Sequence, residues 1–195
     1  MLTEETKRKI KANLVNFRHI TLQNEVKTEY SPAKFHYELS DLLLNEKENV
    51  AIEIFREGAK SNYALRAFPL YCLAYPSQAR DYILIVKGNQ DQASAKLKEI
   101  QDEHQSNPLI KHNLVEIKEC SAKVYSVDLY NEYGEIVNVR IEAYGKGSAI
   151  RGTAHQDRRP KIAILDDIQD KDDARSEAVL ARDWEWFLSD IKFLG

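Results

Sequence analysis

The sequence predicts an α/β fold with a mostly parallel central sheet flanked by helices. Two near-continuous apolar runs, DYILIVK at 81–87 and KIAIL at 161–165, are typical of strands that are buried on both faces of a parallel sheet. The shorter run VAIEIF, within residues 49–55, is a third strand candidate. Segments with helical spacing separate these runs, and strands that alternate with helices predict this fold class.

The chain begins with two predicted helices. Residues 3–20 have the spacing of a charged helix with one apolar face, and we expect residues 1–30 to form a helical lead-in. Pro32 favours the start of a second helix that extends to about Leu44. Residues 31–195 are expected to form one compact domain.

The later elements continue the alternation. Apolar residues recur at helical spacing in three further segments, 60–73, 90–105 and 172–190. Residues 122–130 and 135–143 flank a turn and predict a hairpin that lies at a sheet edge or is inserted antiparallel. Trp184 and Trp186 cannot both face one side of a helix, so we expect one of them to pack on the sheet.

Composition and charge are those of an ordinary globular protein. Of 195 residues, 43% are hydrophobic and 30% are charged, and 28 basic against 31 acidic residues give a net charge of −3. This balance disfavours nucleic-acid binding through the whole surface but allows a local basic patch. The two cysteines and five scattered histidines lack metal-ligand spacing, and the default expectation is a reducing compartment. No apolar run approaches the roughly 18 residues that span a bilayer, so no membrane contact is expected.

The segment EIFREGAKSNYAL, residues 53–65, has the Lys-Ser pair of a phosphate-binding loop without two of its glycines. A helix N-terminus presents free N–H groups to an anion. Lys60 is expected to reach the β and γ phosphates, and Ser61 to ligate Mg²⁺. Ala59 costs little in place of glycine if its backbone is already helical. The nucleotide-binding residues expected here are Glu57, Gly58, Ala59, Lys60, Ser61 and Asn62. Alternatively, the lysine and serine are merely solvated at the start of a helix.

Two acids follow the last predicted strand. Asp166 and Asp167 come directly after IAIL, at the carboxyl end where open α/β sheets bind ligands. We expect Asp166 to hold Mg²⁺ and Asp167 to orient or deprotonate the attacking water. The structural alternative is a pair of loop or helix-capping acids. Taken together, the loop and the acid pair favour a nucleotide site, because both lie at predicted strand ends in the order that such a site requires.

Other candidates surround this pair of motifs. Arg56 suits the oxygens of a transferring phosphoryl group, although it can equally be an exposed arginine paired with a nearby glutamate. Phe35 and His36 are the candidate adenine contacts, with core packing as the alternative. Lys146 and Arg151 are candidates for contact with DNA or with the nucleotide of a neighbouring subunit. Further basic residues at strand or turn ends, Lys87, Arg158 and Arg159, are weaker candidates for phosphate or DNA contact.

Several of these segments together resemble the large subunit of tailed-phage and prophage terminases. The resemblance lies in FREGAKS, in YILIVKGNQDQASAKLKEIQDE, in GKGSAIRGTAHQDRRPKIAILDDIQDKDDARSE and in the tryptophan-containing helix, over roughly residues 35–195. In that family the Walker A loop is deviant and carries an arginine four residues before the lysine, a spacing that Arg56 and Lys60 match. The Walker B strand of the family ends in two acids, which Asp166 and Asp167 match, although many relatives have Glu at the second position.

The resemblance implies a P-loop NTPase with a RecA-like additional-strand core. It implies Mg²⁺-dependent ATP hydrolysis that drives double-stranded DNA into a procapsid, in the host cytoplasm. The implied partners are DNA, the portal protein and the terminase small subunit, with a homo-oligomeric ring in the full motor. In that family a coupling motif would follow shortly after Leu194 and a nuclease domain after it, so residues 31–195 are expected to be the ATPase domain, truncated before the coupling motif and without the nuclease domain. Two alternatives remain open, a non-catalytic nucleotide-binding or assembly remnant of a prophage terminase and a helicase-like ATPase.

Overall fold

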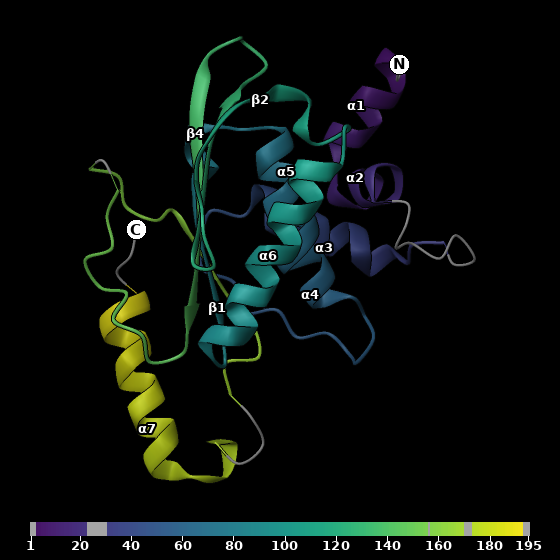
Figure 1. Ribbon diagram of the computed structural model, residues 1–195. Helices are drawn as coiled ribbons and strands as arrows, with labels where there is room; N and C mark the ends of the chain where they lie inside the picture. The colour runs from purple at the N-terminus through teal and green to yellow at the C-terminus, as the bar shows by residue number, and fades with distance from the viewer. Residues whose placement is uncertain (1–2, 23–30, 156, 170–172, 193–195) are drawn as a thin grey trace.

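The structure, a computed structural model, describes residues 3–22, 31–155, 157–169 and 173–192. A five-stranded sheet forms the middle layer, in the order β2-β3-β4-β1-β5. Helices α1 to α6 cover one face of the sheet and α7 lies on the other (Figure 1). The prediction of an α/β fold with helices on a central sheet is therefore confirmed.

The elements have the following bounds. The strands are β1 Tyr82–Lys87, β2 Leu114–Cys120, β3 Val124–Tyr130, β4 Ile136–Gly145 and β5 Ile162–Leu165. The α-helices are α1 Glu4–Ala12, α2 Leu14–Thr21, α3 Lys34–Asn45, α4 Lys60–Asn62, α5 Phe68–Ala74, α6 Gln90–Ser106 and α7 Glu177–Trp186. Two π-helical segments, η1 Tyr63–Ala67 and η5 Phe187–Ile191, and three 3₁₀ turns, η2 Gln78–Arg80, η3 Lys111–Asn113 and η4 Asp173–Arg175, complete the list.

The sheet is mixed rather than mostly parallel. Strand β1 pairs in parallel with β4 and with β5, whereas β3 pairs antiparallel with β4 and with β2. The predicted hairpin is confirmed as β3–β4, and it is inserted beside β1. Strand β2 was not among the elements expected from the sequence, and its residues are largely exposed because it forms an edge of the sheet.

The predicted strand at residues 49–55 is wrong, because the segment has no strand structure and joins no sheet pairing. Only Ile52 and Ile54 pack against the main core, while Val50 and Phe55 are exposed. The alternating apolar residues anchor an extended connection to the core. An extended segment can bury alternate side chains in this way without hydrogen bonding to a neighbouring strand. The described residues thus contain no sheet strand that leads into the phosphate-loop candidate.

The side chains of the strands alternate between the two faces of the sheet. In β1, Ile83 and Ile85 belong to the core beneath α1–α6, and Tyr82, Leu84 and Val86 belong to a smaller core that includes Trp186. Both faces of β1 are buried, which explains its near-continuous apolar sequence. Trp186 packs in the smaller core while Trp184 is exposed, as the sequence predicts for two tryptophans on one helix.

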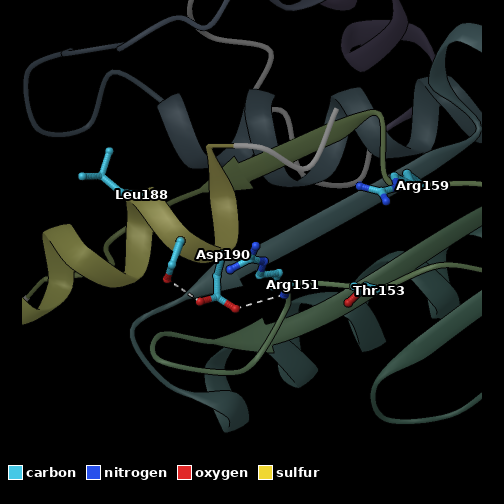
Figure 2. Close-up of a pocket in the computed structure, with 7 residues that line it drawn as sticks. Arg151, Thr153, Arg159, Leu188 and Asp190 are labelled. Atoms are coloured by element: carbon cyan, nitrogen blue, oxygen red, sulfur yellow. Dashed lines mark hydrogen bonds between the residues drawn. The ribbon is translucent and has the colours of Figure 1, made fainter.

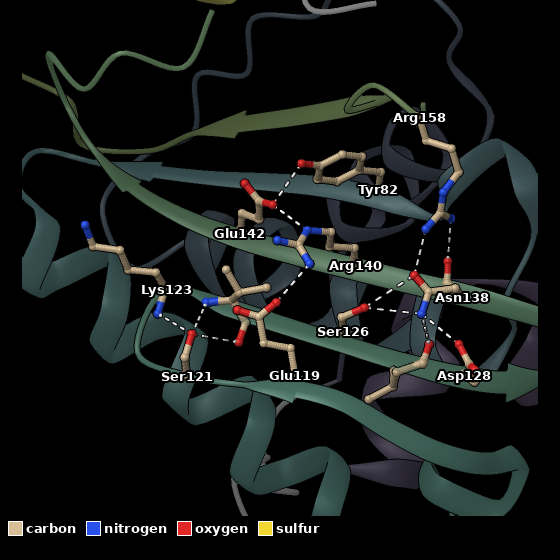
Figure 3. Close-up of polar contacts among 12 residues, drawn as sticks. Tyr82, Glu119, Ser121, Lys123, Ser126, Asp128, Asn138, Arg140, Glu142 and Arg158 are labelled. Carbon is tan, nitrogen blue, oxygen red and sulfur yellow. Dashed lines mark hydrogen bonds and ion pairs between the residues drawn. The ribbon is translucent and has the colours of Figure 1, made fainter. Parts of the chain in front are cut away.

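The remaining part of that second face carries a polar network (Figure 3). Glu142 accepts hydrogen bonds from Tyr82 Oη at 2.8 Å and from Tyr144 Oη at 2.6 Å, and it is paired with Arg140. Arg140 also pairs with Glu119 of β2 at 3.1 Å. These contacts link β1, β4 and β2, and they satisfy charges that would otherwise be costly to bury.

A clamp built on Asp81 fixes the connection that enters β5. Arg158 donates to Asp81 at 3.2 Å and to the backbone and side-chain oxygens of Asn138 at 2.9 and 2.7 Å. Lys161 pairs with the other Asp81 oxygen at 3.0 Å. Arg158, a weaker candidate for phosphate contact on the sequence, is thus held on the sheet by Asp81 and Asn138.

The N-terminal helices share the main core. Ile10, Leu14 and Phe17 are buried in the same cluster as the sheet residues, so packing is continuous across the expected lead-in. The single helix expected over 3–20 is divided at Asn13, whose extended backbone ends α1 and whose side chain caps α2 by accepting from Asn16 N at 2.8 Å. Residues 23–30 lie outside the described part of the chain. None of the described helices combines the length and apolar character that crossing a bilayer demands.

Candidate functional site

The candidate site lies where β1 and β5 end side by side. The parallel register pairs Val86 with Leu165, and Asp166 N donates to Val86 O at 3.1 Å. Because Val86 and Leu165 both face the smaller core, the next residues, Lys87 and Asp166, turn to the face that carries α4. This register brings a lysine and an aspartate together, with no need for a flexible loop between them.

The structure brings Lys60, Ser61 and Asp166 together, as the two sequence motifs predict. Ser61 Oγ donates to Asp166 Oδ2 at 2.8 Å across 105 residues of sequence. Lys60 Nζ lies 3.2 Å from Asp166 Oδ1. Lys87 Nζ donates to Asp166 Oδ2 at 2.9 Å and lies 3.4 Å from Asp167 Oδ2. One buried carboxylate therefore accepts from a hydroxyl and from two ammonium groups.

This environment keeps Asp166 ionised. Burial by itself raises the pKa of the carboxyl, but hydrogen bonds from Lys87 and Ser61 and the charge of Lys87 outweigh burial, with a further contribution from Lys60, so the pKa is lowered. An ionised carboxylate beside a hydroxyl supplies the hard oxygen ligands that Mg²⁺ prefers.

The backbone of the loop differs from the conformation that the sequence analysis expected for Ala59. Ala59 is left-handed, with φ 60° and ψ 19°, so the helical backbone that would make alanine inexpensive at this position is not present. Glu57 is also left-handed, with φ 71°. At Gly58 an added Cβ would lie 2.2 Å from Ile54 Cγ2, so glycine is required by close packing. The Cβ of Ala59 rests against the main core, which holds this strained turn in place.

The helix that follows the loop is continuous from Lys60 to Ala74 through a π segment. Phe68 N bonds to Tyr63 O, the spacing of a wider turn. Pro69 has no N–H to donate within the helix and would crowd a regular α-turn, which the wider turn relieves. Asn62, an expected nucleotide contact, accepts a hydrogen bond from Arg18 Nε at 2.9 Å. Its side chain thus ties the helix to α2.

The two candidate adenine contacts lie beside the loop in a row of rings. His36 stacks on Tyr63 with ring centroids 5.3 Å apart, and Phe35 meets Phe55 edge-on at 5.2 Å. Burial and the charge of Arg18 lower the pKa of His36, although it is also hydrogen-bonded to the backbone of Gly58. Phe55, which sequence reasoning missed, is 68% exposed and adds an open aromatic face next to the loop.

Arg56 and Asp167, the other expected catalytic residues, are both exposed. Arg56 makes no ion pair or hydrogen bond with the described residues, so its guanidinium is free to approach a ligand. The side chain of Asp167 is 73% exposed, and its backbone is left-handed with φ 49°. Gly88 permits this turn, since an added Cβ there would lie 3.0 Å from Asp167 O. The turn after β1 and the turn after β5 therefore pack closely against each other.

The two candidates for contact with DNA or a neighbouring subunit differ in their surroundings. Lys146 is largely buried and is paired with Asp173 and, at 3.0 Å, with Asp183. It ties the end of β4 to the α7 region and presents no free charge. Arg151 is exposed and, with Arg159, Thr153, Leu188 and Asp190, lines a hollow of about 370 Å³ (Figure 2). Asp190 accepts from the backbone N–H groups of Ile150 and Arg151, each at 3.0 Å.

The residues fit a magnesium ion held jointly with phosphates. Ser61 Oγ and Asp166 Oδ2 lie within 2.8 Å of each other, so both can face one ion. The described part of the chain has no cluster of three or more His, Cys, Asp or Glu side chains suited to a metal. Mg²⁺ commonly takes only one or two protein ligands and completes its shell with water and phosphate oxygens, which is the arrangement these two side chains allow.

Sequence reasoning gave Lys87 only a weak role at this edge of the sheet. The contact between Lys87 and Asp166 could have been predicted from the two apolar runs YILIV and IAIL. These runs are followed by Lys87 and Asp166, which become adjacent once the strands are paired in register.

No protein-family model matches this chain, and no curated protein matches it.

Proposed function

We propose that this chain binds ATP with Mg²⁺ at the Glu57–Asn62 loop and Asp166, and hydrolyses it. The observation that carries the proposal is the contact of Lys60 and Ser61 with Asp166, 105 residues further along the chain. A lysine and a hydroxyl at a helix start, facing a buried carboxylate at a strand end, are the parts that a Mg²⁺–triphosphate site needs.

The residues divide the work as follows. The N–H groups at the helix start and the Lys60 ammonium bind the phosphates, while Ser61 and Asp166 hold Mg²⁺. The ion neutralises the charge on the phosphate oxygens when it is bound. Arg56 is exposed beside the loop and can stabilise charge on the transferring group. Asp167 orients the attacking water, and its exposed carboxylate is accessible to it.

The narrower function that we propose is the ATPase domain of a viral genome-packaging motor. It rests on the resemblance of FREGAKS, of the DD-terminated strand and of the neighbouring segments to terminase large subunits. On this proposal, hydrolysis drives double-stranded DNA into a procapsid in the host cytoplasm. The partners are the portal protein, the terminase small subunit and further copies of the chain in a ring.

Calorimetric titration with Mg²⁺ and ATPγS tests the binding site. The parent chain should bind saturably, and Lys60→Ala should lose at least tenfold in affinity. Lys98→Ala is the matched control, because Lys98 is exposed on α6 and is paired with Asp102 away from the site. A parent chain that is folded but does not bind, or a Lys60→Ala variant that binds normally, would overturn the proposal.

A second candidate is a nucleotide-binding module that does not hydrolyse ATP. It is favoured by residues 49–55, which join no sheet strand and therefore hold the loop and Arg56 less firmly than a strand would. Phosphate release from ATP separates the two candidates. Hydrolysis that is lost in Asp167→Asn supports the ATPase, whereas binding with no hydrolysis in the parent chain supports the module.

A further inference from the structure

Lys87 occupies a defined place in the candidate site. It is the last residue of β1, and the parallel register with β5 sets it directly beside Asp166. Its side chain is 13% exposed, and its ammonium contacts both acids, at 2.9 Å for Asp166 and 3.4 Å for Asp167. A lysine this well buried is held by these partners, because they are the only carboxylates it contacts among the described residues.

The charges of the site balance without any metal. Asp166 and Asp167 contribute two negative charges, and Lys60 and Lys87 contribute two positive charges within 3.4 Å of them. Ser61 and Lys87 both donate to the same oxygen, Asp166 Oδ2. The oxygen best placed to bind Mg²⁺ together with Ser61 is therefore the one that Lys87 already neutralises.

Mg²⁺ and Lys87 compete for this oxygen. An ion bound to Asp166 Oδ2 at about 2.1 Å would lie no more than about 5 Å from Lys87 Nζ, since the ammonium is 2.9 Å from the same atom. Two cations at that separation repel each other, and the repulsion is strong because the side chains of Asp166 and Lys87 are largely buried. Phosphate oxygens remove the conflict, because they give both lysines new anionic partners as the metal arrives.

We propose that Lys87 is a built-in counter-ion that holds the metal position closed until a Mg²⁺–nucleotide complex displaces it. The inference rests on the proposed nucleotide site. In the metal-free protein Lys87 keeps Asp166 ionised and oriented, and it makes Mg²⁺ alone a poor ligand. Metal and nucleotide then bind cooperatively, since each favours the state in which Lys87 has left Asp166.

The test measures metal binding without nucleotide. Mn²⁺, a paramagnetic substitute for Mg²⁺, is titrated into the parent chain and into Lys87→Met and is followed by electron paramagnetic resonance. Lys87→Met keeps the aliphatic stem and removes the charge, so it should bind Mn²⁺ at least tenfold more tightly. The factor by which Mn²⁺ strengthens ATPγS binding should fall in proportion, because linkage is reciprocal.

Two variants control the measurement. Lys146→Met removes another lysine that is 14% exposed and paired with two carboxylates, so it should leave Mn²⁺ affinity unchanged. Asp166→Asn in the Lys87→Met background should abolish the gain. Circular dichroism establishes that each variant is folded, and Lys87→Gln, which keeps a donor without the charge, replaces Lys87→Met if that variant does not fold.

The outcomes separate this inference from the proposed function. Mn²⁺ affinity that is equal in the parent chain and Lys87→Met overturns the counter-ion role, even where the parent chain binds Mg²⁺–ATPγS and the nucleotide site stands. Tighter Mn²⁺ binding in Lys87→Met that Asp166→Asn abolishes supports the counter-ion role of Lys87, even where ATPγS does not bind and the proposed function fails. A gain that survives Asp166→Asn also overturns it, because the ion would then bind elsewhere.

Discussion

Replacing Ala59 with glycine should leave the protein as stable as before or slightly more stable. Ala59 has φ 60° and ψ 19°, a left-handed conformation that costs a residue with a Cβ roughly 1–2 kcal/mol. Glycine removes this cost, but it gives the unfolded chain more freedom, worth about 0.4–1 kcal/mol. It also loses a half-buried methyl group, worth about half of 0.8 kcal/mol. With middle values, the net gain is about 0.4 kcal/mol.

The sign of this effect discriminates between two backbones. In a right-handed helical conformation Ala59 would carry no strain, and the same substitution would lose about 1 kcal/mol. Urea denaturation with a common m-value resolves the difference. Ala95→Gly, on the exposed face of α6, is the matched control and should lose roughly 0.5–1 kcal/mol. A loss of 1 kcal/mol or more in Ala59→Gly would refute the left-handed assignment.

Three further substitutions test other parts of the fold and site. Burial lowers the pKa of His104 to about 4, below its ordinary value of 6.5, so the neutral ring contributes stability that is complete above pH 6.5 and is lost as the pH falls toward 4. That contribution is roughly 3 kcal/mol. In urea titrations from pH 7 to 4, the free energy of unfolding should fall with pH in the control His112→Gln, which replaces an exposed histidine. The same fall should be absent in His104→Gln. Arg158→Ala should lose about 1–3 kcal/mol in urea denaturation, because the buried carboxylate of Asp81 then keeps only Lys161 as an ion-pair partner among the described residues, and unchanged stability would contradict the clamp before β5. Gly58→Ala should lose about 1–3 kcal/mol through the clash with Ile54 and should weaken ATPγS binding in calorimetry, whereas a fully stable variant would contradict the packing of the loop.

The layered fold could be read from the sequence because burial on both faces leaves a strong pattern. The runs at 81–87 and 161–165 became β1 and β5, and the hairpin followed from a turn between two alternating segments. The edge strand β2 left no such pattern, since its side chains are mostly exposed. The run at 49–55 misled for the opposite reason, because two buried isoleucines in an extended connection look like one face of a strand.

The site was predictable in its residue types but not in its electrostatics. Lys60, Ser61 and Asp166 are recognisable from motif spacing, and the structure brings them together. The contact of Lys87 with Asp166 depends on which strands are neighbours and on their register, and neither is encoded in local sequence. Lys146 is the opposite case. Its position after a strand suggested that it could bind a ligand, but in the folded chain it is paired with two carboxylates.

Backbone strain gives an independent reason to regard this edge of the sheet as a built site. Among the described residues, four other than glycine have positive φ, and three of them, Glu57, Ala59 and Asp167, belong to the loop or the acid pair. Such conformations cost of order 1–3 kcal/mol each and persist only where the surrounding structure enforces them. Ordinary connections between secondary-structure elements have no need for this cost. Its concentration on the two turns that face Lys60, Ser61 and Asp166 is what a site selected for geometry, at the expense of stability, would be expected to have.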